Sequence, residues 1–192
     1  MKTLSITLLA ILLLTLAGPV AAQDDGSIAR IPEGPGFAIG AFDNGRTYSL
    51  AQTFAVEYGG AFGGAVLAFG EAAGTPTGAV RWEVRRWYSS IGYMGRLLAC
   101  GAWEPLEMAY SSVLADVRLR PGTYALILRA VELQEPGNYW TVIATSGDTD
   151  VYQDGELLQL ERGGEWGAWP GQDVAGVLDL VGPDVMFIEL VG

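Results

Sequence analysis

The 192-residue chain contains no histidine, a single cysteine and a single lysine, Lys2. Without histidine it has no imidazole for Ser-His-Asp or Cys-His catalysis or for a histidine zinc site. No lysine follows residue 2, so Schiff-base chemistry is excluded from the rest of the chain. Because Cys100 stands alone, no disulfide can form within one chain, and a buried, inert thiol is the simpler expectation. An exposed Cys100 would instead be able to pair between chains.

The first 22 residues have the pattern of a secretory signal peptide. Lys2 precedes an apolar run from Leu8 to Leu16, and small residues lead up to Ala22. The run is shorter than the roughly 20 apolar residues that span a bilayer, so cleavage after Ala22 is favoured over a membrane anchor. We therefore expect a secreted, extracellular protein with no membrane insertion after cleavage.

Positive charge is scarce in the remaining chain. The 170 residues left when 22 are removed from 192 carry 10 arginines against 22 acidic residues, a net charge of −12. Nucleic acid would repel such a protein, so we expect no nucleic-acid partner. Strong net charge also opposes association, and we expect a monomer.

Short segments in which apolar and polar residues alternate recur along the chain, the period-2 pattern of half-buried strands. Residues 23–45 are rich in Gly, Pro and Asp and indicate a flexible leader, which leaves residues 46–192 as a single domain. No window sustains a helical period. Turn-separated strands predict an all-β fold, either an antiparallel two-sheet sandwich or a barrel. Strands are expected within residues 46–58, 64–69, 79–88, 96–100, 113–119, 123–130, 139–144, 175–181 and 185–191, with a hairpin at Asp154-Gly155.

The segment of residues 79–88, AVRWEVRRWY, separates two tryptophans. Alternation places Trp82 with its neighbouring valines on one face, which predicts a core residue. Trp87 falls on the opposite face, with the charged residues. We therefore expect Trp87 to be exposed and a candidate for ligand binding.

A second aromatic candidate is the segment GGEWGAWPGQD, residues 163–173, which has too many glycines to favour a strand. Sugars stack on aromatic rings through their apolar faces, while neighbouring polar side chains bond their hydroxyl groups. The predicted ligand-binding residues are thus Trp87 together with Trp166, Trp169, Glu165, Gln172 and Asp173. The alternative is that one of the loop tryptophans folds back to plug the end of the sandwich.

Several segments in a fixed order resemble small jelly-roll modules of exported bacterial proteins, the carbohydrate-binding-like and choice-of-anchor domains. The segments are AQTFAV, GTPTGAVRWEV, LRPGTYALIL, NYW, GGEWGAW and GQDVAGVLDLVG. The resemblance runs from about Leu50 to Gly182. It implies a jelly-roll β-sandwich that is not an enzyme and that binds carbohydrate. Beyond it, residues 183–192 are expected to add one more edge strand.

Carboxylates are the remaining catalytic or metal-binding groups. Glu132 and Glu135 could be the pair that a glycosidase requires, but they lie in a turn where acids are expected to face water, so we expect no catalytic residues. Residues 150–161 resemble a calcium loop with Tyr152 at a ligand position, which favours a hairpin over a calcium site. Calcium bound by other loop carboxylates, Asp148, Asp150, Asp154 and Asp173, stays an alternative. We expect no metal and no cofactor.

The sequence therefore predicts a secreted, non-catalytic β-sandwich module whose partner is a polysaccharide or surface glycan bound by exposed aromatic rings. The alternative is a structural or adhesive protein that acts by self-association through edge strands or Cys100, with no small ligand. Exposure of Trp87, Trp166 and Trp169 on one shared face would favour the first function.

Overall fold

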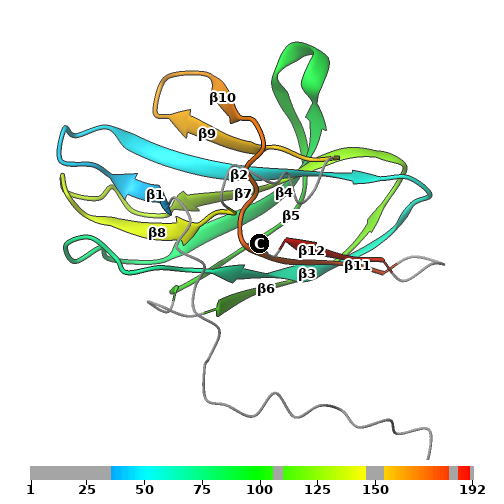
Figure 1. Ribbon diagram of the computed structural model, residues 1–192, viewed down its shortest axis with the longest axis horizontal. Helices are drawn as coiled ribbons and strands as arrows, with labels where there is room; N and C mark the ends of the chain where they lie inside the picture. The colour runs from blue at the N-terminus through cyan, green and yellow to red at the C-terminus, as the bar shows by residue number, and fades with distance from the viewer. Residues whose placement is uncertain (1–35, 106–109, 146–153, 182–185, 191–192) are drawn as a thin grey trace, which may run out of the picture. The chain divides into compact units, whose positions relative to one another are not determined.

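The computed structural model describes residues 36–105, 110–145, 154–181 and 186–190, and most of them form β-strands (Figure 1). A single short 3₁₀ turn among them, η1 (Ser89–Ile91), joins β4 to β5. No helix in this part of the chain is long and apolar enough to cross a membrane. The strands are β1 (Gly36–Ala41), β2 (Thr47–Val56), β3 (Gly60–Ala68), β4 (Val80–Tyr88), β5 (Tyr93–Trp103), β6 (Tyr110–Leu119), β7 (Gly122–Ala130), β8 (Tyr139–Ile143), β9 (Leu157–Glu161), β10 (Trp166–Trp169), β11 (Gly176–Val181) and β12 (Met186–Leu190).

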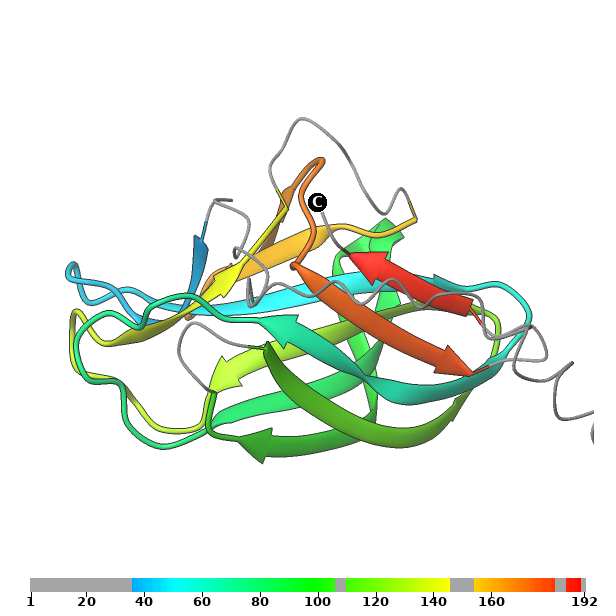
Figure 2. The ribbon, with the colours of Figure 1, turned by 60° about the horizontal axis from the view of Figure 1, so that its bottom comes forward.

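The strands form two antiparallel sheets, sheet A and sheet B. Sheet A has the order β10-β9-β2-β7-β4-β5, with β1 beside β2 and β8 beside β1, and sheet B has the order β12-β11-β3-β6. The sheets pack face to face around an apolar core (Figures 1 and 2), where Phe54 of β2 stacks on Phe62 of β3 with ring centroids 5.5 Å apart. The predicted all-β fold with a two-sheet β-sandwich is confirmed.

Six consecutive strands pair as nested hairpins. β4 pairs with β5, β3 with β6 and β2 with β7, so that each pair encloses the previous one in the sequence. The pairs alternate between the sheets, since β2–β7 and β4–β5 belong to sheet A and β3–β6 to sheet B. The full jelly-roll arrangement, with its two Greek keys, stays a prediction.

Strand β4 shows how alternation builds the two faces of sheet A. Trp82 is buried in the core between the sheets, as predicted. The residues between the core positions, Glu83 among them, lie on the opposite, outer face of sheet A. Trp87 also lies on the outer face, in a second apolar cluster that we call the outer cluster. Its members are Ala51, Trp87, Ala125, Ile127 and Leu158, with Met94 and Trp166 packed against them.

Two strands were not expected from the sequence. Residues 36–41, predicted as part of a flexible leader, instead form β1, which pairs with β8 over residues 36–40 and buries Phe37 and Ile39. Residues 166–169, predicted as a loop, form β10, which pairs with β9. The predicted signal peptide, residues 1–22, and the leader segment 23–35 lie outside the described residues.

Of two further predictions, the one for a C-terminal edge strand is correct and the one for a buried cysteine is not. β12 pairs with β11 at the edge of sheet B (Figure 2), so the additional edge strand is confirmed. Cys100 of β5 is exposed, which corrects the expectation of a buried thiol. The physical reason is that β5 ends the strand order of sheet A and much of it stays open to solvent.

Candidate functional site

Trp87 does not present an exposed ring. It lies on the predicted face of β4, but only 8% of its surface is accessible, which corrects the expectation of exposure. Met94 of β5 is its register partner and packs against the outer cluster to which Trp87 belongs. Alternation specifies the face of a strand, but tertiary packing decides whether that face is covered.

Trp166 and Trp169 point to opposite faces of sheet A. Trp166 pairs with Leu160 and packs against the outer cluster, whereas Trp169 pairs with Leu157, a residue of the core between the sheets. Trp169 is the exposed ring of the two, at 44%. The three predicted tryptophans therefore do not share one exposed face.

Trp169 lies in a pocket of about 330 Å³, which we call the aromatic pocket. Its lining comes from four strands and one turn, in two stretches of the sequence, residues 36–48 and 159–169. The exposed rings are those of Trp169 and Phe42. The lining side chains with polar groups are the amides of Asn44 and Gln159 and the phenol of Tyr48. The lining residues are Gly36, Phe37 and Ala38 of β1, Phe42 and Asn44 of the turn after it, Tyr48 of β2, Gln159 of β9 and Trp169 of β10.

Ring-to-ring contacts hold the wall of the aromatic pocket. Phe37 meets Trp169 edge to face, with centroids 5.2 Å apart. Phe42 stacks on Tyr139 at 4.6 Å and meets Tyr48 edge to face at 5.5 Å. Such aromatic pairs are worth about 0.5–1.5 kcal/mol beyond the area that they bury. The rings are therefore fixed in place before any ligand arrives.

Arg46 braces the turn beside the aromatic pocket. Its Nη1 donates a hydrogen bond to Glu161 Oε2 at 3.1 Å, and its backbone N–H donates to Asn44 Oδ1 at 2.9 Å. The pKa of Arg46 is held above its ordinary value, chiefly by the side-chain hydrogen bond to Tyr48 and next by the charge of Glu161. These contacts tie the turn after β1 to β2 and β9, the strands that contribute Tyr48 and Gln159.

The polar residues predicted around the tryptophans do not line the aromatic pocket. Glu165 is exposed in the turn before β10, and Gln172 follows that strand. Asp173 is buried, with only 1% accessible, and its Oδ1 accepts a hydrogen bond from Gln52 Nε2 at 2.7 Å. Because a buried, bonded carboxylate cannot meet a ligand at the surface, the structure gives Asp173 a role in packing the loop before β11 onto β2.

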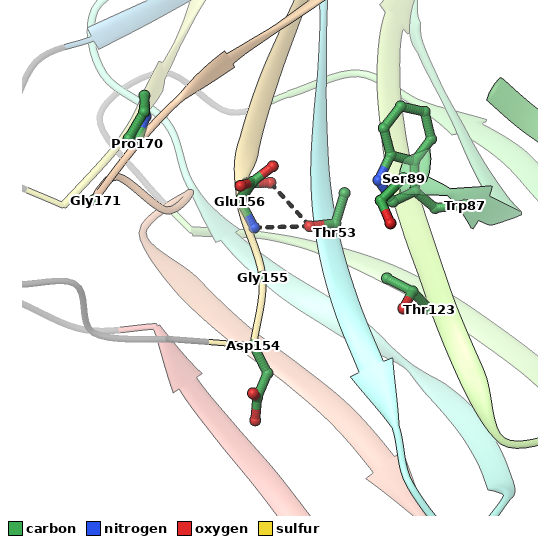
Figure 3. A pocket seen from close by; sticks show the side chains of 9 residues that line it. All are labelled: Thr53, Trp87, Ser89, Thr123, Asp154, Gly155, Glu156, Pro170 and Gly171. Carbon is green, nitrogen blue, oxygen red and sulfur yellow. Dashed lines mark hydrogen bonds between the residues drawn. The ribbon is translucent and has the colours of Figure 1, made fainter. Parts of the chain in front are cut away.

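A second pocket, of about 360 Å³, lies on the outer face of sheet A (Figure 3). Its one aromatic ring is that of the buried Trp87, and hydroxyl and carboxylate groups make up most of the rest. Thr53 Oγ1 is engaged with the backbone of Glu156, from whose N–H it accepts at 2.7 Å. The lining residues are Thr53, Trp87, Ser89, Thr123, Asp154, Gly155, Glu156, Pro170 and Gly171.

The two predicted carboxylate sites differ in how far the structure describes them. Glu132 and Glu135 are both exposed in the turn after β7, as expected for acids that face water. Of the calcium-loop segment, residues 150–153 lie outside the described residues, as do Asp148 and one arm of the predicted hairpin at Asp154-Gly155. Within the described ranges, no group of three or more His, Cys, Asp or Glu side chains is placed to hold a metal ion.

Apart from Trp169, none of the residues that line the aromatic pocket is among the predicted ligand-binding residues. Phe37 and Phe42 belong to the segment predicted as a flexible leader, and Tyr48 was grouped with the apolar positions of a strand. The available signal was the alternation of Phe37, Ile39 and Ala41, which is typical of a strand despite the neighbouring glycines.

Comparison of the chain with protein-family models, curated proteins and solved structures found no match. The functional interpretation consequently depends on the geometry of the site. Exposed rings beside neutral amides suit a ligand with both apolar faces and hydroxyl groups.

Proposed function

We propose that the chain is a secreted, non-catalytic module of jelly-roll type that binds carbohydrate, a polysaccharide or surface glycan, in the aromatic pocket. The observation that carries the proposal is the exposed ring of Trp169, set in a pocket with Phe42 and two amide side chains. Sugars offer apolar C–H faces to such rings and hydroxyl groups to such amides.

Size and composition support the same ligand class. The pocket volume of about 330 Å³ lies at the small end of the range for ligand sites, roughly 300–1,000 Å³. It therefore suits a short stretch of a glycan better than a long one. Asn44 and Gln159 are neutral and offer both donors and acceptors, as hydroxyl groups require.

The two tryptophans of β10 provide a matched test. Trp169→Ala removes an exposed ring of the aromatic pocket, so retention on the polysaccharide that the parent protein binds should be lost. The free energy of unfolding should fall by about 0.5–1.5 kcal/mol through the lost contact with Phe37, less than for a fully buried tryptophan. Trp166→Ala removes a ring from the same short strand but from the outer cluster, so it should lower stability and leave binding intact. Retention on insoluble polysaccharides and a glycan array, with urea unfolding of each variant, measures both quantities.

The opposite pattern would count against the proposal. If Trp169→Ala unfolds the protein as readily as a core substitution, the ring is a plug. If the parent protein binds no glycan of a broad array, the binding function is wrong.

A second candidate function, self-association, is favoured by Cys100. Its exposed thiol lies on β5, the last strand in the order of sheet A, where unpaired backbone groups offer a template for another chain. Sedimentation with and without reductant tests this function. A monomer in both conditions, unchanged by Cys100→Ser, would eliminate it, whereas an oligomer that survives reduction would favour edge pairing over a disulfide.

A further inference from the structure

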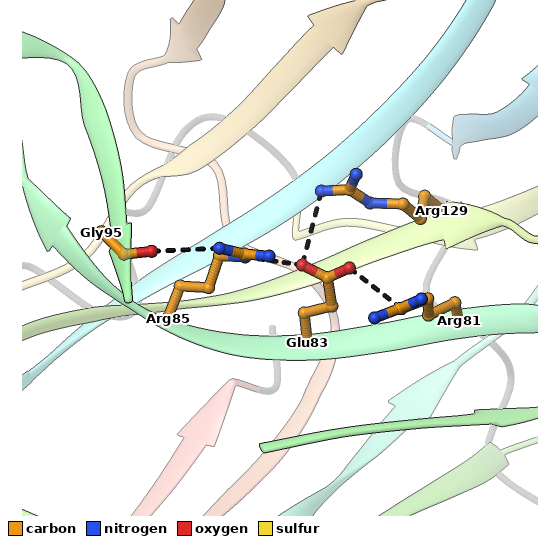
Figure 4. A network of polar contacts seen from close by, with 5 residues as sticks. All are labelled: Arg81, Glu83, Arg85, Gly95 and Arg129. Carbon is orange, nitrogen blue, oxygen red and sulfur yellow. Dashed lines mark hydrogen bonds and ion pairs between the residues drawn. The ribbon is translucent and has the colours of Figure 1, made fainter. Parts of the chain in front are cut away.

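A carboxylate on the outer face of sheet A is surrounded by three arginines (Figure 4). Glu83 of β4 has a side chain that is only 4% exposed. Its Oε2 lies 2.6 Å from Arg85 Nε and 3.7 Å from Arg129 Nη2, and its Oε1 lies 3.0 Å from Arg81 Nε. We call Arg81, Arg85 and Arg129 the arginine triad.

The triad carries more positive charge than Glu83 can balance. Three guanidinium groups face one carboxylate, which leaves two positive charges. Arg81 and Arg129 are register partners on adjacent strands, and like charges placed opposite one another are unfavourable without a counter-ion. A stable ion pair with Glu83 would require one arginine.

Donor groups of the triad remain available to solvent. The three side chains are between 27% and 43% exposed, although Glu83 beneath them is buried. Arg129 has the longest contact with Glu83. The Nε atoms of Arg81 and Arg129 are buried and make no hydrogen bond within the described residues, so they are not the donors that face solvent. Arg85 is the most engaged, because its Nη1 also donates to the Gly95 carbonyl at 3.1 Å.

Among the described residues, the register neighbours of the triad on this face include no acid other than Glu83. The two acids of the second pocket on the same face, Asp154 and Glu156, lie beside β2, on the other side of β7. The register partner of Arg81 on β5 is Ala102, and Glu83 lies between Cys100 of β5 and Ile127 of β7. Ala125 is the register partner of Arg85. The chain as a whole is strongly acidic, but at about 0.15 M salt charges are screened beyond about 8 Å, so an approaching anion responds mainly to this local cluster.

We propose that the arginine triad is an anion-binding surface for an acidic polysaccharide, which it holds through carboxylate or sulfate groups. Guanidinium forks match the two oxygens of such groups, for which the carboxylate of Glu83 competes. The surface lies on the outer face of sheet A and shares no residue with the aromatic pocket. It therefore goes beyond the proposed function and does not depend on it.

The test compares binding to immobilised polygalacturonate, dextran sulfate and neutral dextran at low and high salt. The protein should bind one or both acidic polymers at low salt, dissociate from them at high salt and not bind neutral dextran. Stronger binding to polygalacturonate would identify carboxylate as the recognised group, and stronger binding to dextran sulfate would identify sulfate. Arg129→Gln should weaken binding about tenfold, because it removes the least engaged guanidinium.

Glu83→Gln separates binding from a merely structural role. It raises the local charge from two to three positive units and should tighten binding by a similar factor, even though it lowers stability. Arg118→Gln, an exposed arginine of β6 in sheet B, makes the same change in net charge as Arg129→Gln and should leave affinity unchanged.

Each contrary result overturns the inference. The proposed site is wrong if the protein does not prefer the acidic polymers to neutral dextran. It is also wrong if Arg118→Gln and Arg129→Gln lose the same amount of affinity for them. If a folded Glu83→Gln variant binds the acidic polymers more weakly than the parent protein, the three arginines serve only to stabilise the buried carboxylate of Glu83. If the protein binds single-stranded DNA as tightly as the acidic polysaccharides, the triad binds polyanions in general and does not recognise polysaccharide. The Trp169→Ala variant should still bind the acidic polymers. A negative result for the arginine triad can therefore be told apart from a negative result for glycan binding in the aromatic pocket.

Discussion

The hydroxyl group of Tyr124 closes a hydrogen-bonded loop with Arg120, four residues earlier. It donates to the Arg120 carbonyl at 2.6 Å and accepts from the Arg120 N–H at 3.1 Å. This arrangement resembles the tyrosine corner of β-sandwiches, in which a tyrosine hydroxyl bonds the backbone a few residues upstream. It fixes the tight connection between β6 and β7.

Tyr124→Phe should lower the free energy of unfolding by about 1–3 kcal/mol, because the ring keeps its packing while backbone groups lose their partner. Urea unfolding measures the change. Tyr93→Phe removes a hydroxyl from an exposed tyrosine of β5 and should have almost no effect. Equal stability of the Tyr124→Phe variant and the parent would show that water replaces the bond.

Gly101 of β5 leaves room for the Trp82 ring. A Cβ added at Gly101 would lie 2.7 Å from Trp82 Nε1, closer than packed atoms approach. We expect Gly101→Ala to cost about 1–3 kcal/mol through displacement of that buried ring. Trp82→Ala should cost about 3–5 kcal/mol as a large-to-small core substitution. The double variant should be less destabilised than the sum of the two, and strict additivity in the cycle would refute the contact.

Gln52 attaches the loop before β11 to β2. Its Nε2 donates to Asp173 Oδ1 at 2.7 Å, and its Oε1 accepts from the Val174 N–H at 2.8 Å. Gln52→Leu keeps the volume but removes both bonds, and should cost about 1–3 kcal/mol or more because a buried carboxylate loses a donor. Asp173→Asn keeps an acceptor and should cost less, as thermal unfolding of the pair would show. The reverse order would mean that the carboxylate charge, rather than the bond, stabilises the loop.

Removal of divalent metal should leave the fold intact. Glu161, the last residue of the candidate calcium loop, is paired with Arg46, and Asp173 is bonded by Gln52. Both carboxylates therefore have protein partners that stabilise them without a cation. Melting curves with and without EDTA should coincide, and a fall in Tm that calcium reverses would demonstrate a structural ion.

Most strands could be predicted because their alternation is strong, as in Val80, Trp82 and Val84 of β4. β1 and β10 were missed because glycines interrupt the alternation of both strands. Each also depends on a partner strand: β1 pairs with β8, which lies far along the chain, and β10 pairs with β9, which lies before the preceding turn. The face of Trp87 was correct but its burial was not, because Met94 of the neighbouring strand helps to cover it. The aromatic pocket combines β1, β2, β9 and β10, so local pattern could identify Trp169 but not its partners.

The nested pairing of six strands also has a kinetic consequence. The β4–β5 hairpin closes the shortest loop, β3–β6 encloses it and β2–β7 closes the longest of the three. Because the entropy lost on closing a flexible loop grows with its length, each inner pair lowers the cost of the next one outward. We expect the chain to fold from β4–β5 outward, at the slow rates typical of non-local β-topologies, milliseconds to seconds. The aromatic pocket, which needs β1, β9 and β10, would then be among the last parts of the molecule to form.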